Sequence, residues 1–198
     1  MLIEEVSGLG FIDYINENII KKANINPDDL SFTISNKGHQ AIGYQKRFSF
    51  TNLILGMLMD KSKYMNKSEG KWISSKNFYV SGTPYGGLIG SGKGFVAYLQ
   101  EMLRKESCFI SEESKTKLFT ENRTNNNKAT GMCLGWFKGE LEGHTYFTHA
   151  GGGGFYYCEI RIYPELGTGS VIMFNRTGMT DSRILDKADE YFLNPRKE

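Results

Sequence analysis

The spacing of apolar residues along the chain predicts three amphipathic helices. In the segments 10–22, 95–105 and 181–193, apolar side chains recur three or four positions apart, as on the buried face of a helix. The predicted inward faces are Phe11, Ile12, Ile15, Ile19 and Ile20 in the first, Phe95, Leu99, Met102 and Leu103 in the second, and Ile184, Leu185, Ala188, Tyr191 and Phe192 in the third. A short fourth helix is expected after Ser111, a suitable N-cap. The stretch 24–84 shows no sustained period and is expected to be irregular, with a solvent-exposed polar loop at 60–71.

From residue 131 onward the apolar period changes to two, which predicts β-strands. Four strands are expected, at 132–138, 144–150, 155–163 and 170–175, and the short turns "GELEG" and "PELGTG" suit antiparallel neighbours. In the third strand, one face carries Tyr156, Cys158, Ile160 and Ile162, and the other carries Phe155, Tyr157, Glu159 and Arg161. The last strand, "SVIMFN", is apolar on both faces and is therefore expected to be central. An antiparallel sheet with helices packed on it is an α+β fold.

Composition narrows the class of protein. The chain has 198 residues, a formal charge of +2 and scattered lysines, so nucleic acid is not an expected partner. No Cys-x-x-Cys pair is present, so the zinc and redox motifs built on such pairs are absent. Cys133 and Cys158 fall inside apparent strands and are interpreted as buried free thiols, with a disulfide as the alternative. No apolar run approaches 18 residues, which argues against a membrane span.

One short stretch combines a titratable side chain with unusual backbone freedom. In "FTHAGGGGFYY", residues 147–157, His149 precedes four glycines. Glycine in a strand loses backbone entropy and packs nothing, so a run of four needs a reason. Exposed N–H groups there could bind a developing oxyanion or an extended substrate. The alternative is a glycine-rich bulge beside an ordinary surface histidine. No special role is expected for His39 or His144.

Beyond these patterns, "HAGGGGFYYCEIRIYPELGTGSVIMFN" resembles the C-terminal core of the serine β-lactamase and penicillin-binding-protein superfamily, in its class C β-lactamase-like and esterase-like branch. That family carries a Lys-or-His, any residue, Gly motif on a strand, here His149-Ala150-Gly151. Four further stretches are similar in family order: "LIEEVSGLGFIDYINENII", "HQAIGY", "YGGLIGSGKGFVAYLQEML" and "GMCLGWF". One departure lies in the third, where the aspartate usual at the helix start is Gly94, which puts the helix cap in doubt.

The resemblance implies acyl transfer through a serine ester, without metal or cofactor. It implies that the strand of His149 binds the substrate backbone and that the N–H of Gly152 forms half of an oxyanion hole. Ala150, Gly151 and Gly153 would line the substrate, and His149 would hold a substrate carboxylate or relay a proton. The implied substrate is a small molecule or peptide: a β-lactam, a D-Ala peptide or an ester.

The family nucleophile, the serine of a Ser-x-x-Lys motif, and the family Tyr-x-Asn motif both precede the region that this chain matches. Look-alikes occur at Ser68–Lys71 and Ser114–Lys117, with Tyr14–Asn16 and Tyr64–Asn66. Their order in the chain differs from that of the family, and both serines are expected in polar, loop-like surroundings that would not lower a lysine pKa. None of these look-alikes is therefore expected to be catalytic.

Two readings follow for function. In the first, residues 1–198 form the C-terminal portion of a β-lactamase-like serine hydrolase domain, inactive alone, with 1–130 mostly helical and irregular and 131–198 forming antiparallel strands plus a C-terminal helix. In the second, the chain is a non-catalytic binding module or decayed paralogue that retains the substrate-facing strand. "MLIEEVSG" reads as the middle of a helix, and no signal peptide is recognised. Localisation therefore stays unknown, although family members are usually exported. The edge of 170–175 is expected to be open, which predicts self-association or pairing with a missing N-terminal part of the same protein.

Overall fold

The computed structural model describes residues 1–58, 60–79, 81–153, 155–179 and 184–194. Helices α1 (Leu2–Ser7), α2 (Phe11–Ile15), α3 (Phe50–Leu58), α4 (Thr83–Gly86), α5 (Gly92–Leu103), α6 (Glu112–Phe119) and α7 (Ile184–Leu193) alternate with strands β1 (Leu30–Ser31), β2 (Tyr44–Lys46), β3 (Met65–Glu69), β4 (Trp72–Ser75), β5 (Ile89–Gly90), β6 (Phe137–Leu141), β7 (His144–Gly153), β8 (Tyr156–Tyr163) and β9 (Thr168–Phe174). A π-helical turn, Asn16–Ile20, extends α2, and short 3₁₀ turns occupy Lys37–His39 and Lys61–Lys63. None of the helices in this described part is long and apolar enough to span a bilayer.

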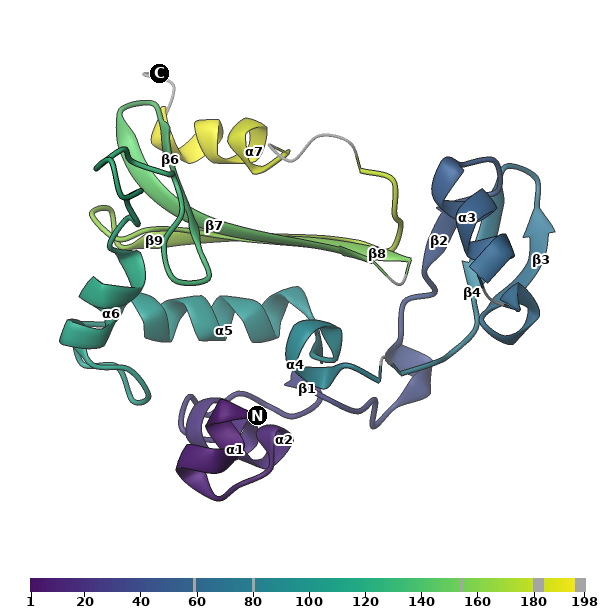
Figure 1. Ribbon diagram of the computed structural model, residues 1–198, viewed down its shortest axis with the longest axis horizontal. Coiled ribbons are helices and arrows are strands. Elements are labelled where there is room, and N and C mark those ends of the chain that lie inside the picture. The colour runs from purple at the N-terminus through teal and green to yellow at the C-terminus, as the bar shows by residue number, and fades with distance from the viewer. Residues whose placement is uncertain (59, 80, 154, 180–183, 195–198) are drawn as a thin grey trace.

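The main body is an antiparallel sheet in the order β6-β7-β8-β9, with α5 on one face and α7 on the other (Figure 1). This confirms the predicted α+β class. Strand β9 lies at one end of this order, so its predicted central position is wrong within these residues. Among the described strands, β9 pairs only with β8, so its other edge has no described strand partner.

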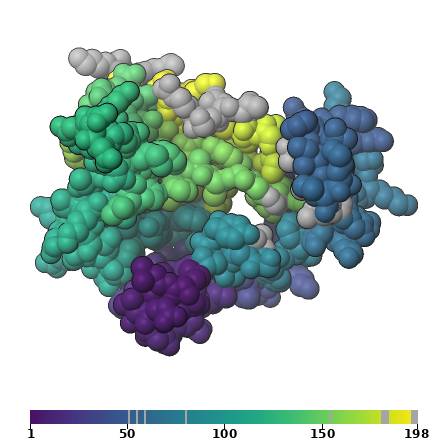
Figure 2. Space-filling model, in the orientation of Figure 1, coloured from purple at the N-terminus to yellow at the C-terminus, as the bar shows by residue number. Residues whose placement is uncertain are grey.

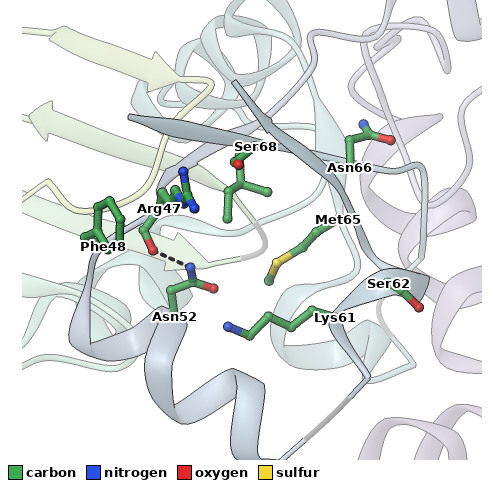
Figure 3. A pocket seen from close by; sticks show the side chains of 9 residues that line it. Arg47, Phe48, Asn52, Lys61, Ser62, Met65, Asn66 and Ser68 are labelled. Atoms are coloured by element: carbon green, nitrogen blue, oxygen red, sulfur yellow. Dashed lines mark hydrogen bonds between the residues drawn. The ribbon is translucent and has the colours of Figure 1, made fainter. Parts of the chain in front are cut away.

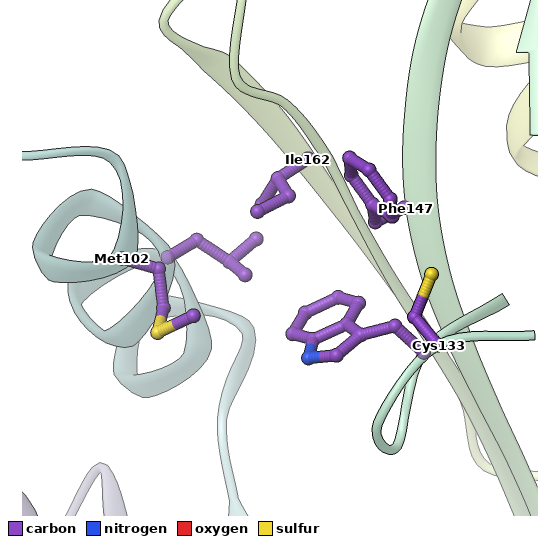
Figure 4. Close-up of a cluster of buried hydrophobic side chains, with 6 residues drawn as sticks. Met102, Cys133, Phe147 and Ile162 are labelled. Atoms are coloured by element: carbon purple, nitrogen blue, oxygen red, sulfur yellow. The ribbon is translucent and has the colours of Figure 1, made fainter. Parts of the chain in front are cut away.

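The face of the sheet toward α5 carries the larger apolar core. Leu99 and Met102 of α5 pack there against Phe147 of β7 and Ile162 of β8, and the cluster is completed by Cys133 and Trp136 (Figure 4). These side chains are at most 8% exposed, and the predicted inward face of the helix at 95–105 is confirmed for Leu99 and Met102. The core therefore fixes α5 against the sheet, mainly along β9 and β8.

The opposite face of the sheet buries charge rather than only apolar groups. Arg161 of β8 is 1% exposed and forms ion pairs with Glu159, Asp186 and Asp189 at 3.1, 2.8 and 3.2 Å. Its guanidinium also lies 4.0 Å above the Tyr146 ring. Because the two aspartates belong to α7, this cluster attaches the helix to the sheet.

The buried ion pairs correct the predicted face of the last helix. Leu185, Asp186 and Asp189 are buried, whereas Tyr191 is 78% and Phe192 42% exposed. The charge of Arg161 needs anionic partners in a dry site, and this requirement outweighs the apolar spacing that predicted the face. Residues 181–183 of the predicted helix lie outside the described residues.

Three other predictions about elements need correction. Strand β6 begins at Phe137 rather than 132, because Gly135 adopts a left-handed φ of +76° that ends any extended run. Its hairpin turn is the pair Glu142-Gly143, both at positive φ, so most of "GELEG" is strand. The helix predicted at 10–22 ends its α-helical part at Ile15, and Ile12 is 37% exposed.

The stretch 24–84 is not irregular. It contains the three-stranded antiparallel sheet β2-β4-β3 and helix α3, which form a separate unit at one end of the molecule (Figure 1). We call residues 41–79 the small lobe. The predicted polar loop at 60–71 is largely strand β3 and its turn to β4. The sequence period failed here because β3 is buried only at its first residue, Met65.

Candidate functional site

All five predicted site residues lie in a row on β7, and one edge of that row is unpaired. Strand β8 pairs with the whole row, from His149 opposite Ile160 to Gly153 opposite Tyr156. On the other side, β6 pairs with β7 only from His144 to Thr148. No described strand pairs with the second edge of 149–153, so alternate N–H and C=O groups there point away from the sheet. We call this segment the glycine edge.

The register assigns each side chain of this segment to one face of the sheet. Phe147 packs against α5, and alternation along the strand places His149 and Gly151 on the same face. Thr148, whose hydroxyl donates to Glu159 at 3.2 Å, lies on the α7 face together with Ala150 and Gly152. His149 therefore lies on the α5 face of the sheet, beside the unpaired backbone of the glycine edge.

The chain's own packing does not explain why residues 151–153 are glycine. A Cβ added at Gly151 or Gly152 would meet ordinary van der Waals contacts, with Cys158 Sγ at 3.6 Å and Tyr157 Cδ2 at 3.4 Å. A Cβ at Gly153 would meet nothing within 4 Å, and none of the three has a positive φ. The absence of side chains at 151–153 therefore leaves open space beside the strand. A strand that binds the backbone of a ligand requires such space.

The neighbour of His149 determines which of its ring nitrogens carries the proton. Its Nδ1 atom lies 2.7 Å from the carbonyl oxygen of Gly135. A carbonyl can only accept, so Nδ1 carries the hydrogen, and Nε2 of the neutral ring is left as an acceptor. The ring of Phe137 lies 6.1 Å away and further borders the imidazole. An exposed histidine held in one tautomer can accept a proton or bind an O–H group at a defined position.

The far end of the glycine edge is anchored to the small lobe. Phe155, which turns the chain into β8, has a φ of +78° and is buried against Met65 and Ile73. Gly43 makes this contact possible, because a Cβ there would lie 2.6 Å from that of Phe155. The Tyr156 hydroxyl donates to the Ala41 carbonyl at 2.7 Å. The "AIGY" stretch therefore supports the tip of the β7–β8 hairpin. The fourth glycine, residue 154, lies outside the described residues.

None of the three cysteines is an activated nucleophile. All three are free thiols. Cys133 is buried, as interpreted, but lies just before β6 rather than within a strand, whereas Cys158 lies within β8 but is only partly buried. Burial raises the pKa of Cys158 and of Cys133, and it also raises that of Cys108. A raised pKa keeps the thiol protonated near neutrality and unreactive. In the described part of the chain, no cluster of His, Cys, Asp and Glu could hold a metal ion.

The two Ser-x-x-Lys look-alikes lack the surroundings of a serine nucleophile. Ser68 is exposed within strand β3 rather than in a loop, which corrects the expectation of loop-like surroundings, and Lys71 is exposed in the turn to β4. Ser114 lies within helix α6 and not in a loop, which corrects the same expectation. Its partner Lys117 is 70% exposed and ion-paired with Glu113 at 2.6 Å, so its amine is directed to a carboxylate at the surface.

The helix start at Gly94 is capped despite the departure from the family pattern. Ser91 accepts a hydrogen bond from the Gly94 N–H at 3.1 Å, and Asp29 approaches from another segment to accept from Ser91 and Lys93. The hydrogen bond from Lys93 lowers the pKa of Asp29, so a carboxylate stands at the positive end of the α5 dipole. A Cβ at Gly94 would lie 2.2 Å from the Asp29 carbonyl oxygen, so only glycine fits.

The sequence reasoning missed Gly135 and Phe155, which hold the two ends of the site. The only available signal at Gly135 was a glycine between two apolar residues, in "LGW". Phe155 follows the glycines directly, but its positive φ and its contact with the small lobe depend on a tertiary fold that the local pattern does not encode.

The structure is thus an antiparallel sheet with a helix on each face, and His149 lies on the α5 side beside an open, glycine-rich strand edge. The β-lactamase family model matches residues 1–191, and the chain belongs to the β-lactamase family. No curated protein matches the chain.

Several solved structures share this fold. An octameric penicillin-binding-protein homologue from Pyrococcus abyssi superposes with a TM-score of 0.71 at 22% identity, over all of this chain and 41% of its own. A class C β-lactamase gives 0.67 at 12% identity, over all of this chain and 54% of its own. A D-stereospecific amidohydrolase from Streptomyces sp. gives 0.65 at 16% identity, over 96% and 50% of the two chains. The chain thus spans about half the length of these structures.

Proposed function

We propose that residues 1–198 form the C-terminal part of a serine acyl hydrolase, a β-lactamase, DD-peptidase or esterase, that acts through a serine acyl-enzyme. The observation that carries the proposal is the unpaired glycine edge beside His149, whose open space the chain's own packing does not explain. An extended acyl substrate would lie along this edge and hydrogen-bond to its backbone.

In this mechanism the glycine edge stabilises the tetrahedral intermediate. The N–H of Gly152 would donate to the oxyanion, and one such donor contributes roughly 3 kcal/mol to transition-state stabilisation. His149, with Nδ1–H directed to Gly135, would present Nε2 to a substrate carboxylate or to the group that exchanges protons with the leaving atom. The nucleophile would come from a Ser-x-x-Lys segment outside residues 1–198.

The test compares this chain with the longest natural polypeptide that contains it. Each is incubated with a fluorophosphonate and with a β-lactam, and the intact mass is recorded. We expect no adduct on 1–198 and one adduct per molecule on the longer polypeptide. A stoichiometric adduct on Ser68 or Ser114, or a longer polypeptide without Ser-x-x-Lys, would refute the proposal.

Two substitutions in the longer polypeptide test the assigned roles. Gly152→Val is expected to lower turnover on the order of 10²-fold because it disturbs an oxyanion donor. His149→Ala is expected to lower turnover while the fold survives. Gly92→Ala, at the start of α5 and outside the glycine edge, is the control, since its added Cβ would meet nothing within 4 Å. Hydrolysis at the parent rate by the Gly152→Val variant would exclude the oxyanion assignment.

The alternative is a binding module without chemistry, which the open edge would also suit. It is distinguished by the same experiment. A longer polypeptide that binds a D-Ala peptide without ever forming an adduct would establish the alternative.

A further inference from the structure

Helix α3 of the small lobe carries its apolar side chains outward. Phe50, Leu53, Met57 and Leu58 are between 62% and 78% exposed, and Phe48, just before the helix, is 81% exposed. The buried position on the helix is polar: Asn52 donates to the Arg47 carbonyl at 2.6 Å and accepts from Gln45 at 3.1 Å. A helix on the surface of a globular protein normally has the reverse pattern, and a contiguous exposed apolar patch marks an interaction site.

The contact between the lobe and the main body does not use this face. Met65 and Ile73, on the small sheet, pack against Phe155 of the hairpin tip, and Tyr44 of β2 hydrogen-bonds to Asn175. Figure 2 shows the lobe at one end of the molecule, beyond the main sheet. The apolar face of α3 therefore stays uncovered although the lobe is fully attached.

The small lobe is also strongly basic. Residues 41–79 contain seven Lys and Arg and two acidic residues, a formal charge of +5, while the whole chain carries only +2. The remainder of the chain is therefore net acidic. The basic residues are Lys46, Arg47, Lys61, Lys63, Lys67, Lys71 and Lys76. Within the described residues, none of the seven forms an ion pair with a carboxylate.

A cavity of about 350 Å³ adjoins the helix, and its polar lining suits an anion (Figure 3). Arg47 and Lys61 both border it, together with Ser62, Asn66 and Ser68. Gly56 of α3 allows the Lys61 side chain to lie against the helix, because a Cβ there would be 2.5 Å from Lys61 Cε. Arg47 and Lys61 thus border the same cavity, and within the described residues neither is ion-paired with a carboxylate.

We propose that the small lobe docks on an anionic phospholipid surface. The apolar face of α3 would enter the boundary between headgroups and acyl chains, as an interfacial amphipathic helix does. The Lys and Arg side chains of the lobe would bind lipid phosphates. The cavity between Arg47 and Lys61 would receive one phosphate. Charge complementarity favours an anionic lipid surface over a neutral one, because only an anionic surface would attract the +5 charge of the small lobe.

The test is co-sedimentation of the 198-residue chain with vesicles of phosphatidylcholine alone and with vesicles containing about one third phosphatidylglycerol. We expect binding only to the anionic vesicles, and weaker binding in about 0.5 M salt because screening shortens the range of the attraction. The Leu53→Ser/Met57→Ser and Lys46→Glu/Lys63→Glu double variants are each expected to bind at least about tenfold more weakly. All four side chains are exposed, so the fold should survive these changes.

Matched controls alter the same chemistry elsewhere. Leu2→Ser/Val6→Ser removes two apolar side chains that are 81% and 80% exposed on α1, and Lys105→Glu/Lys128→Glu changes the net charge equally outside the lobe. Both controls should bind like the parent. Equal loss in the controls, or no preference for anionic vesicles, overturns the proposal. A dimer in light scattering that Leu53→Ser/Met57→Ser converts to monomer, without vesicle binding, also overturns it and assigns the face to a second copy of the chain.

Discussion

The Nδ1 atom of His149 lies 2.7 Å from the carbonyl oxygen of Gly135, 14 residues earlier in the chain. Gly135 can direct its carbonyl there because it adopts a φ of +76°, which other residues rarely adopt. One backbone conformation in a loop thus sets the proton position on a side chain of the neighbouring strand.

This contact predicts the tautomer of His149. Long-range proton–nitrogen NMR of the neutral ring should find the proton on Nδ1. Gly135→Ala should cost about 1–2 kcal/mol in unfolding free energy and abolish this preference, because alanine disfavours the left-handed conformation. Gly143→Ala, at a φ of +78° in the β6–β7 turn, is the control with equal backbone strain and an unchanged His149. A proton found on Nε2 in the parent protein contradicts the prediction.

A second prediction contrasts two glycines. Gly153→Ala should leave the unfolding free energy unchanged or raise it slightly, since its Cβ meets nothing and alanine lowers the entropy of the unfolded chain. Gly94→Ala should destabilise by roughly 1–3 kcal/mol, because its Cβ would overlap the Asp29 carbonyl. Urea denaturation measures both. Equal destabilisation would mean that the glycine edge is packed against this chain after all.

The buried cluster around Arg161 predicts that removing its cation costs far more stability than removing one of its carboxylates. Arg161→Met leaves three carboxylates, Glu159, Asp186 and Asp189, without their cation, and should cost roughly 3–5 kcal/mol at pH 7. Glu159→Gln leaves Arg161 with two aspartates and should be neutral or stabilising at that pH.

The pH dependence of these variants follows from the pKa of Glu159. Burial raises this pKa above its ordinary value of 4.5, against the opposing effect of Arg161. A raised carboxyl pKa means that the folded state binds the proton more tightly. The associated stability is fully present below the unfolded value and is lost as the pH rises through the folded one. The unfolding free energy of Glu159→Gln, measured by urea denaturation, should therefore rise relative to that of the parent protein between pH 4 and pH 7. A loss at pH 7 as large as that of Arg161→Met would contradict this account.

The open edge of β9 predicts self-association of residues 1–198. An uncovered strand with apolar neighbours invites pairing with another chain. Size exclusion with light scattering should give a mass above 22.4 kDa that rises with concentration. The Leu53→Ser/Met57→Ser variant separates this edge from the apolar face of α3, and should still associate. A 22.4 kDa monomer with strongly protected amides at 170–175 would mean that the chain closes its own sheet.

Much of the main body could be predicted from the sequence. Helix α5 and strands β7 and β8 were predicted because each buries an apolar stripe in one core, and the period of that stripe identifies the element. The face of α7 was predicted wrongly, because Arg161 is 23 residues earlier in the chain than Ile184 and its demand for carboxylates is invisible in local spacing. The small lobe was missed because β3 buries only Met65, β4 buries two serines beside Ile73, and α3 exposes apolar residues.

The candidate site divides in the same way. The row from His149 to Gly153 was recognisable from composition and from the family resemblance. Its open edge was not, because that depends on where β6 stops pairing, and β6 begins five residues later than the pattern indicates. The role of Gly135 follows from that same late start.

The anchoring of the glycine edge at both ends has a mechanical consequence. A run of glycines without other contacts would be flexible and would sample many backbone conformations, so it could not hold a backbone N–H donor at a defined position. Here both ends of the segment are held. The His149 ring bonds to the Gly135 carbonyl at one end, and Phe155 packs into the small lobe at the other. A substitution in the lobe core, such as Ile73→Ala, would weaken the packing of Phe155. It would thereby change the conformation of the glycine edge without altering any residue of the site.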